Sequence, residues 1–186
     1  MNGTTITILT YNIFMGPIDG ETLSVSKRLV EIIKALTILN QKTNNSIDVI
    51  CFQEFWDSFF DDYGLSTIGK IIRFNGISVQ YKNFFILALK NIGFKYHVTI
   101  GRCYGKFKNG GLLIVSKHPI INYDEYYYNG SELTSIDSLS SKGIIWAKIK
   151  KKNLIFNIFN THYQAWPSHN ITRILQTLAF KKFINK

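Results

Sequence analysis

The chain has 186 residues, of which 46% are hydrophobic and 15% aromatic, and its formal net charge at pH 7 is +10. A chain of this length and composition can bury the core of one globular domain and is not a disordered segment. It contains no run of roughly 20 apolar residues that could span a bilayer, and its N-terminus lacks the basic and apolar segments of a signal peptide. We therefore expect a cytoplasmic protein, free to associate with a membrane surface.

The positive charge is concentrated at the C-terminal end of the sequence. Residues 1–137 hold 13 Lys+Arg and 12 Asp+Glu, a balance of +1, whereas residues 138–186 hold 9 Lys+Arg and no carboxylate. This asymmetry favours an anionic partner, either nucleic acid or an anionic membrane surface. A solvated basic face, or one that packs on an acidic segment outside this sequence, explains it equally well. Cys51 and Cys103 form no spaced pair, which fits a reducing compartment.

The first part of the chain predicts a strand, a helix and a second strand. Residues 5–11 alternate threonine with apolar side chains, and this strand ends at Asn12. Residues 22–39 repeat apolar side chains every three or four positions, as in an amphipathic helix. The buried stripe of that helix is expected to be Leu29, Ile32, Ile33, Leu36 and Leu39. Residues 48–52 form a short, almost wholly apolar strand followed by Gln53 and Glu54.

A strand, a helix and a strand over this distance form a βαβ unit, so the two strands should run parallel with a right-handed crossover. Parallel strands bring their carboxyl ends to one edge of the sheet, where open α/β folds bind their ligands. We therefore expect Asn12 and Glu54 to face the same crevice.

The remainder predicts further helices and a set of strands. A helix is expected around 57–74, and residues 81–90 suggest another. From Phe94 onward the pattern is that of a β-rich region. The candidate strands are 96–102, 111–116, 120–128, 144–150 and 154–159. A final amphipathic helix is expected over 168–183, with Ser168 as its N-cap.

The strand 154–159 ends in the polar residues Asn160, Thr161 and His162. Taken alone, His162 could simply satisfy a turn, but the two earlier strands also end in polar residues. A carboxylate, an amide and an imidazole suit a divalent cation and a phosphate, because Mg²⁺ prefers oxygen ligands and imidazole can stabilise or protonate phosphate oxygens. One carboxylate does not by itself define a catalytic metal site.

Four segments follow one another in chain order: residues 9–13 (Leu-Thr-Tyr-Asn-Ile), 48–54 (Asp-Val-Ile-Cys-Phe-Gln-Glu), 109–120 (Asn-Gly-Gly through Ser-Lys-His-Pro-Ile) and 160–162 (Asn-Thr-His). Together they resemble the motifs of the endonuclease/exonuclease/phosphatase superfamily. The resemblance implies an α/β fold, a βαβ-started two-sheet sandwich flanked by helices. It covers nearly the whole chain, and we expect residues 1–186 to form the N-terminal part of a single such domain.

Within that superfamily the chain is most similar to neutral sphingomyelinases. Residues 162–165 (His-Tyr-Gln-Ala) resemble their His-x-Gln-Ala signature, and residues 141–144 (Ser-Lys-Gly-Ile) resemble their Lys-Gly segment. Arg173 and Gln176 on the final helix also fit. The resemblance implies a phosphodiesterase-type hydrolase that requires Mg²⁺ or Mn²⁺ and releases phosphocholine from sphingomyelin.

The resemblance also implies roles for individual residues. Glu54 would be the principal metal-binding carboxylate, Asn12 would lie beside the metal-bound phosphate, and Asn160 would belong to the same catalytic group. His162 would donate a hydrogen bond to a phosphate oxygen in the transition state. Lys142 and Arg173 would be substrate-binding, although a lysine before a glycine is often a loop residue and an arginine often anchors its own helix.

Two family motifs have no counterpart in this sequence. The family completes its site with an Asp-x-Asn pair and a final Asp-His pair, whose histidine is the general base, and both lie downstream of the Asn-x-His strand. No carboxylate follows Asp137 here. His97, His118 and His169 lie in a strand pattern, a loop and a helix start, and none is a convincing substitute. We expect a truncated, split or partly sequenced member, with a complementing C-terminal half among its candidate partners.

Two alternative functions remain open on the sequence. The first is a nuclease of the same superfamily, which the positive charge would suit. The second is a catalytically incomplete fragment that binds a partner. The sequence leaves the oligomeric state and the source organism undetermined.

Overall fold

The computed structural model describes residues 4–15, 25–56, 79–103, 106, 109–128, 140–165 and 167–186. Its helices are α1 (Val25–Lys42), α4 (Val79–Asn91) and α5 (Asn170–Ile184), the last preceded by a 3₁₀ turn at Pro167–His169. Its strands are β1 (Ile8–Asn12), β2 (Val49–Gln53), β3 (Tyr96–Thr99), β4 (Leu113–Ser116), β5 (Ile120–Tyr127), β6 (Gly143–Lys151) and β7 (Leu154–Thr161). The helix predicted around 57–74 lies outside the described residues.

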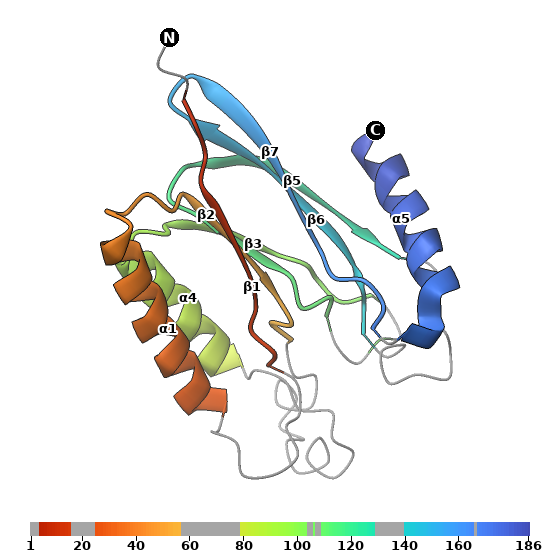
Figure 1. Ribbon diagram of the computed structural model, residues 1–186, viewed down its shortest axis with the longest axis horizontal. Helices are drawn as coiled ribbons and strands as arrows, with labels where there is room; N and C mark the ends of the chain where they lie inside the picture. The colour runs from red at the N-terminus through yellow and green to blue at the C-terminus, as the bar shows by residue number, and fades with distance from the viewer. Residues whose placement is uncertain are drawn as a thin grey trace.

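The strands form two sheets that pack on one another between outer helices (Figure 1). The first sheet has the order β1-β2-β4-β3, and the second has the order β5-β6-β7. β1 and β2 pair in parallel, with Asn12 opposite Gln53, whereas β4 is antiparallel to both of its neighbours. The predicted βαβ start and the two-sheet sandwich are therefore both confirmed.

The strand β2 is covered on both faces, as its continuous apolar sequence predicted. Ile50 and Phe52 face the helices and pack with residues such as Leu29 of α1 and Phe85 of α4. Val49 and Cys51 face the second sheet and pack with residues of β4 and β6. Because successive side chains of a strand point to opposite faces, one short strand contributes to both core layers. α1 and α4 lie outside the first sheet, and α5 lies on the opposite side of the molecule (Figure 1).

Two local expectations were wrong. Leu39 is 37% exposed, because the neighbouring Asn40 takes the buried position and donates to the backbone oxygen of Ile92 at 3.3 Å. Ser168 does not cap the last helix, since the chain makes a 3₁₀ turn first and the capping position falls on His169, which makes no side-chain capping bond.

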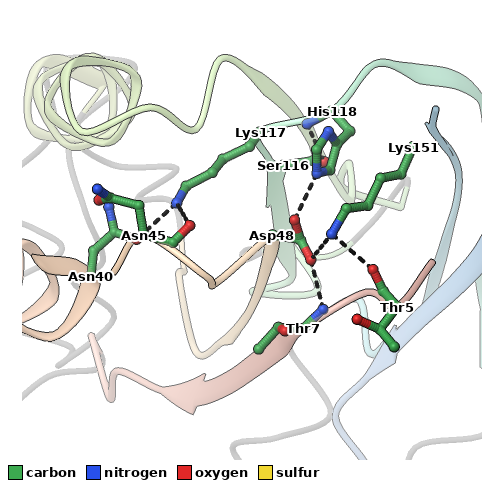
Figure 2. A network of polar contacts seen from close by, with 9 residues as sticks. All are labelled: Thr5, Thr7, Asn40, Asn45, Asp48, Ser116, Lys117, His118 and Lys151. Atoms are coloured by element: carbon green, nitrogen blue, oxygen red, sulfur yellow. Dashed lines mark hydrogen bonds and ion pairs between the residues drawn. The ribbon is translucent and has the colours of Figure 1, made fainter. Parts of the chain in front are cut away.

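The two sheets are joined at one end by a group of polar residues that we call the Asp48 cluster: Thr7, Asp48, His118 and Lys151 (Figure 2). Asp48 is 6% exposed; its Oδ1 lies 2.7 Å from His118 Nε2, and its Oδ2 accepts bonds from Lys151 Nζ at 2.7 Å and from the Thr7 amide at 2.8 Å. The Thr7 carbonyl oxygen in turn accepts the Asp48 and Val49 amides at 2.9 and 3.2 Å, so both backbone groups of Thr7 connect the residue before β1 to the start of β2. Burial would raise the pKa of Asp48, but these three hydrogen bonds outweigh it and hold the pKa below its ordinary value.

The strands β1 and β7 are edge strands in the described part of the two sheets. Apolar side chains on both are left accessible, including Ile8 at 47%, Leu154 at 46% and Ile155 at 46% exposure. No helix within the described ranges is long and apolar enough to cross a bilayer.

Candidate active site

The three predicted strand-end residues lie at the same end of the molecule. Asn12 is the last residue of β1, Glu54 follows β2, and His162 follows β7. Because Asn12 is opposite Gln53 in the parallel pair, the chain brings Asn12 directly beside Glu54. An open cleft of about 530 Å³ lies along the edge strands and is lined by Asn12, Gln53, Asn160 and His162, among others.

A single carboxylate oxygen joins these residues. Asn12 Nδ2 donates to Glu54 Oε1 at 2.8 Å, and His162 Nε2 lies 3.7 Å from the same oxygen. The Glu54 and His162 side chains are 16% and 22% exposed, so both are shielded but still accessible, and His162 lines the cleft. The amide of Asn12 thus orients the carboxylate towards the imidazole.

Glu54 has a φ of +59°, which is unusual for a residue with a side chain. Its backbone oxygen accepts a bond from Met15 N at 3.0 Å, and the next amide, that of Phe55, donates to Gly111 O at 2.9 Å. The backbone is therefore held in this conformation from both sides. Strained conformations of this kind are concentrated at functional sites.

An aromatic ring supports the histidine. The Trp56 ring centroid is 6.0 Å from that of His162, and Lys142 Nζ lies 5.8 Å from the Trp56 centroid. The loop opposite needs glycine at position 111, because its φ is +63° and an added Cβ would lie 2.8 Å from a carbon of the Trp56 ring. Trp56 is therefore packed between the histidine and a closely approaching loop.

Asn160 was predicted as part of the catalytic group, and the structure directs its amide into the protein. Asn160 is 3% exposed; its Nδ2 donates to Phe52 O at 2.8 Å and to Leu113 O at 3.2 Å. Its Oδ1 accepts a bond from Gln53 Nε2 at 2.7 Å. Since Gln53 precedes Glu54 and Asn160 precedes the histidine by two residues, this amide pair connects the two strand ends.

The two predicted substrate-binding residues contact the backbone near the site. Lys142 is 4% exposed and its Nζ donates to Tyr163 O at 2.9 Å. Arg173 donates to Gln164 O at 3.2 Å and to Pro167 O at 3.3 Å, and also contacts Asn170 Oδ1. Both residues therefore hold the segment that follows His162.

Other titratable groups near the cleft keep their protons at neutral pH. Burial raises the pKa of Cys51, which borders the cleft, to about 12, so its thiolate is not available as a nucleophile. Burial likewise raises the pKa of Tyr128, whose hydroxyl lies 2.7 Å from Thr161 Oγ1 beside the histidine. Sequence reasoning missed Gln53, Trp56 and Tyr128 as neighbours of the site. For Gln53 the signal was available, since it directly precedes the selected glutamate.

The described residues contain no group of three or more His, Cys, Asp or Glu side chains that could hold a metal ion. Glu54 does offer carboxylate oxygens beside the cleft, whereas Asn12 turns its amide nitrogen to Glu54 and its oxygen accepts the Phe14 amide at 3.0 Å. Mg²⁺ is commonly bound through one or two carboxylates while water and substrate phosphate complete its coordination. The Glu54 carboxylate therefore fits Mg²⁺ or Mn²⁺, with most ligands supplied from outside the described residues.

Comparison with known proteins gives a consistent result. Residues 9–139 match the model of the Endonuclease/Exonuclease/phosphatase family. The chain is 25% identical over 162 residues to sphingomyelinase C of Bacillus cereus, covering 87% of this chain and 44% of that protein. It therefore spans less than half the length of that relative.

Solved structures share the fold. Sphingomyelinase C from Streptomyces griseocarneus matches with a TM-score of 0.71 and 16% identity, covering 98% of this chain and 59% of that one. A variant of beta toxin from Staphylococcus aureus with bound magnesium ions matches with a TM-score of 0.66 and 17% identity, covering 98% of this chain and 59% of that one. At these identities the likeness concerns the fold.

Proposed function

Because the chain belongs to the endonuclease/exonuclease/phosphatase family, we propose that it contributes to a phosphodiester hydrolase that releases phosphocholine from sphingomyelin. The observation that carries this proposal is that Asn12 Nδ2 and His162 Nε2 both approach the same oxygen of Glu54, Oε1, beside the cleft. The choice of substrate is supported by the sphingomyelinases among its relatives.

Glu54 is the residue that would hold the divalent cation, Mg²⁺ or Mn²⁺, with Asn12 beside it. When bound, such a cation neutralises charge on the phosphate and makes a bound water more acidic. The Asn12 amide keeps the Glu54 carboxylate in one orientation through its 2.8 Å bond. His162 Nε2, directed at the same point, donates to a phosphate oxygen as negative charge develops there.

Asn160, Lys142 and Arg173 act indirectly in this proposal. Asn160 fixes the end of β7 to β2 and β4, so it sets the distance between the histidine and Glu54. Lys142 holds the backbone of Tyr163, and Arg173 holds the backbone of Gln164. They are positioning residues, whereas the sequence resemblance had suggested catalysis or substrate contact.

The site lacks a general base among the residues assigned so far. His118 is engaged with Asp48 at the opposite end of β2 from Glu54, and His97 lies on β3, at the edge of the first sheet opposite to β1. A positioned base is worth about 10²–10⁴-fold in rate. We therefore infer that a second polypeptide segment, corresponding to the rest of the relatives' length, completes the site with a base and further carboxylates.

The direct test is an assay of phosphocholine release from sphingomyelin in the presence of Mg²⁺. Residues 1–186 and any longer product of the same gene are assayed in parallel, each with Glu54→Gln as control. We expect negligible turnover from residues 1–186, and turnover abolished by Glu54→Gln in any longer product that contains the completing segment. Robust turnover from residues 1–186 alone would contradict the need for completion, and turnover that survives Glu54→Gln would contradict the proposed site.

The charge of the chain supports one alternative substrate. A net charge of +10 suits a nucleic acid, whose phosphates attract lysine and arginine. A nicking assay on supercoiled DNA under the same conditions separates the two substrates. Faster cleavage of DNA than of sphingomyelin would favour a nuclease of the same family, and absence of both activities in the longer product would favour a catalytically incomplete protein.

A further inference from the structure

The first part of helix α5 presents large aliphatic residues to solvent and two polar residues to the protein. Thr172 and Gln176 are 5% and 2% exposed and face inward. The outward residues are Ile171 at 74%, Ile174 at 59%, Leu175 at 57% and Leu178 at 58% exposure, which we call the α5 stripe. A surface helix normally shows the reverse arrangement, with its apolar side against the core.

Specific contacts hold the helix in this orientation. At its N-terminal end, the Gln164 amide donates to Gln176 Oε1 at 2.8 Å, and Arg173 donates to the Gln164 carbonyl. At its C-terminal end, the Phe183 and Phe180 rings pack against Phe159 of β7 at centroid distances of 6.3 and 5.9 Å. With both ends fixed to the second sheet, the aliphatic stripe cannot turn inward.

The spacing of the stripe makes it one continuous surface. Its residues follow one another at intervals of three, one and three positions, which places them within about 100° of the helix circumference. Continuing from Leu178 by three and four positions reaches Lys181 and Lys182, both exposed. The aliphatic surface therefore runs directly into a pair of lysines on the same side of the helix.

The charged side chains of α5 and of the β6–β7 hairpin are all positive. Residues 138–186 contain nine Lys+Arg and no Asp or Glu. Asp124 of β5 lines a cleft with Phe183, Ile184 and Lys186 at the end of α5, so one acidic side chain lies there beside the basic ones. An aliphatic helix side bordered by lysines is the pattern of helices that lie in the interface of anionic membranes. Lysine side chains suit this position because their stems are apolar while their heads reach the lipid phosphates.

We propose that the α5 stripe docks on the surface of an anionic lipid bilayer, with Lys181 and Lys182 at the headgroups. α5 lies on the side of the molecule opposite α1 and α4, so neither of these helices covers it (Figure 1). The inference goes beyond the proposed hydrolysis, because it concerns binding to lipids that are not substrates.

The test is co-sedimentation of residues 1–186 with vesicles that contain no sphingomyelin. One set is phosphatidylcholine alone, and the other contains about 30% phosphatidylserine, since acidic lipids supply the attraction. We expect binding to the anionic vesicles only, and a loss of at least about tenfold in partitioning for Leu175→Gln/Leu178→Gln, because the apolar insertion is removed. Lys181→Gln/Lys182→Gln should weaken binding to the anionic vesicles and reduce its salt dependence.

Matched controls replace side chains of the same kinds elsewhere. Ile121→Gln/Leu154→Gln removes two aliphatic residues that are 49% and 46% exposed on β5 and β7, and Lys34→Gln/Lys90→Gln removes two lysines of α1 and α4. Both controls should bind vesicles as the parent does. The emission of Leu178→Trp should shift to the blue on vesicle binding and be quenched by brominated lipids, which a purely electrostatic contact would not produce.

Three results would overturn the proposal. The first is that the parent chain does not bind anionic vesicles. The second is that the stripe variants bind them as the parent does. The third is that the stripe variants change the oligomeric state but not vesicle binding. The last result would assign the stripe to a second copy of the chain. None of these measurements depends on catalysis, so failure of the proposed hydrolysis would be recognised separately.

Discussion

The two ends of β2 each carry a buried or shielded carboxylate, and the two carboxylates have different surroundings. Asp48, before the first residue of the strand, accepts from a lysine and a backbone amide and lies 2.7 Å from a histidine nitrogen. Glu54, after its last residue, accepts a neutral amide at 2.8 Å and lies 3.7 Å from a histidine nitrogen. The negative charge of Asp48 is balanced by Lys151 within the protein. The carboxylate of Glu54 has no lysine or arginine partner among the residues that the structure describes, so it can still bind a cation.

The two ends of the sandwich therefore have different roles, one structural and one in the candidate active site. The Asp48 cluster ties the β6–β7 hairpin to the start of the first sheet through Lys151, which also donates to Thr5 O at 2.8 Å (Figure 2). The other end is held by the Gln53–Asn160 amide pair and leaves the cleft open. We infer that one end clamps the two sheets and the other uses their fixed separation for chemistry.

The largest effect is expected from removing the charge at the open end. In a form that hydrolyses phosphodiesters, Glu54→Gln should lower kcat/KM by more than about 100-fold, because even residues behind the metal ligands cost about 10–100-fold. The measurement is steady-state kinetics over a series of Mg²⁺ concentrations. Asp48→Asn serves as the control and should retain most activity at a temperature where it is folded. Equal activity of Glu54→Gln and the parent at saturating Mg²⁺ would remove Glu54 from the mechanism.

The next largest effect is expected from His162 and distinguishes binding of phosphate from binding of the metal ion. His162→Ala should lower turnover by about 100-fold, as expected for loss of one donor to developing negative charge. The affinity for Mn²⁺, measured by calorimetry, should stay within about threefold, because the proposed partner of His162 is phosphate. A large loss of Mn²⁺ affinity would instead make His162 a metal ligand.

At the clamped end the expected effect is on stability. Asp48→Asn should lower the free energy of unfolding by about 3 kcal/mol, since removing one partner of a buried ion pair leaves the other charge uncompensated. For a chain of this size, this corresponds to a fall in Tm of about 6–12 °C. A double-mutant cycle with Lys151→Met should show a strong coupling between the two losses in the free energy of unfolding. Additive losses from the two substitutions would argue against a clamp.

The stability of the clamp should also depend on pH. Because the pKa of Asp48 is lower in the folded protein, its contribution is fully present above the unfolded pKa of about 4 and is lost as the pH falls through the folded value. His118, Lys151 and the nearby Lys117 are the charged or titratable groups that face it. In urea unfolding, the difference between parent and Asp48→Asn should be large at pH 6 and should shrink progressively as the pH is lowered below about 4. A difference that does not shrink on acidification would contradict this linkage.

The smallest effect is expected beside the open end. Arg173→Ala should lower the free energy of unfolding by about 1 kcal/mol, because it removes hydrogen bonds to backbone oxygens that are partly accessible to water. Turnover should change far less than in Glu54→Gln. Thermal unfolding measures the change in stability, and the same kinetic assay measures turnover. A loss of activity as large as that of Glu54→Gln would show that Arg173 binds the substrate directly.

The open end was largely predictable from sequence, and the clamped end was not. Asn12, Glu54 and His162 each lie at or just after the end of a strand, and the parallel pairing that brings Asn12 beside Glu54 is a local consequence of the βαβ unit. Lys151, by contrast, looks like an ordinary residue of a lysine-rich hairpin turn. Its bond to Asp48 spans 103 residues and depends on how the two sheets pack, which no local pattern specifies.

The contacts of Asn160, at the site itself, were also not predictable from a local sequence pattern. Its position near the histidine suggested catalysis, but the direction of its amide depends on the carbonyls of Phe52 and Leu113, which belong to the other sheet. The pattern located the residue, and only the packing of the sheets revealed what it contacts. The same holds for Trp56, which needs the glycine loop of residue 111 to complete its position.

The most direct test of the assigned cation site is paramagnetic broadening of the histidine ring signals of residues 1–186 by Mn²⁺. The account predicts that substoichiometric Mn²⁺ broadens His162, which lies beside Glu54, before His118, which lies beside Asp48. Glu54→Gln should abolish the broadening of His162, and Asp48→Asn should leave it in place. Broadening of His118 first, or broadening of His162 that survives Glu54→Gln, would contradict the assignment of the cation site to the open end.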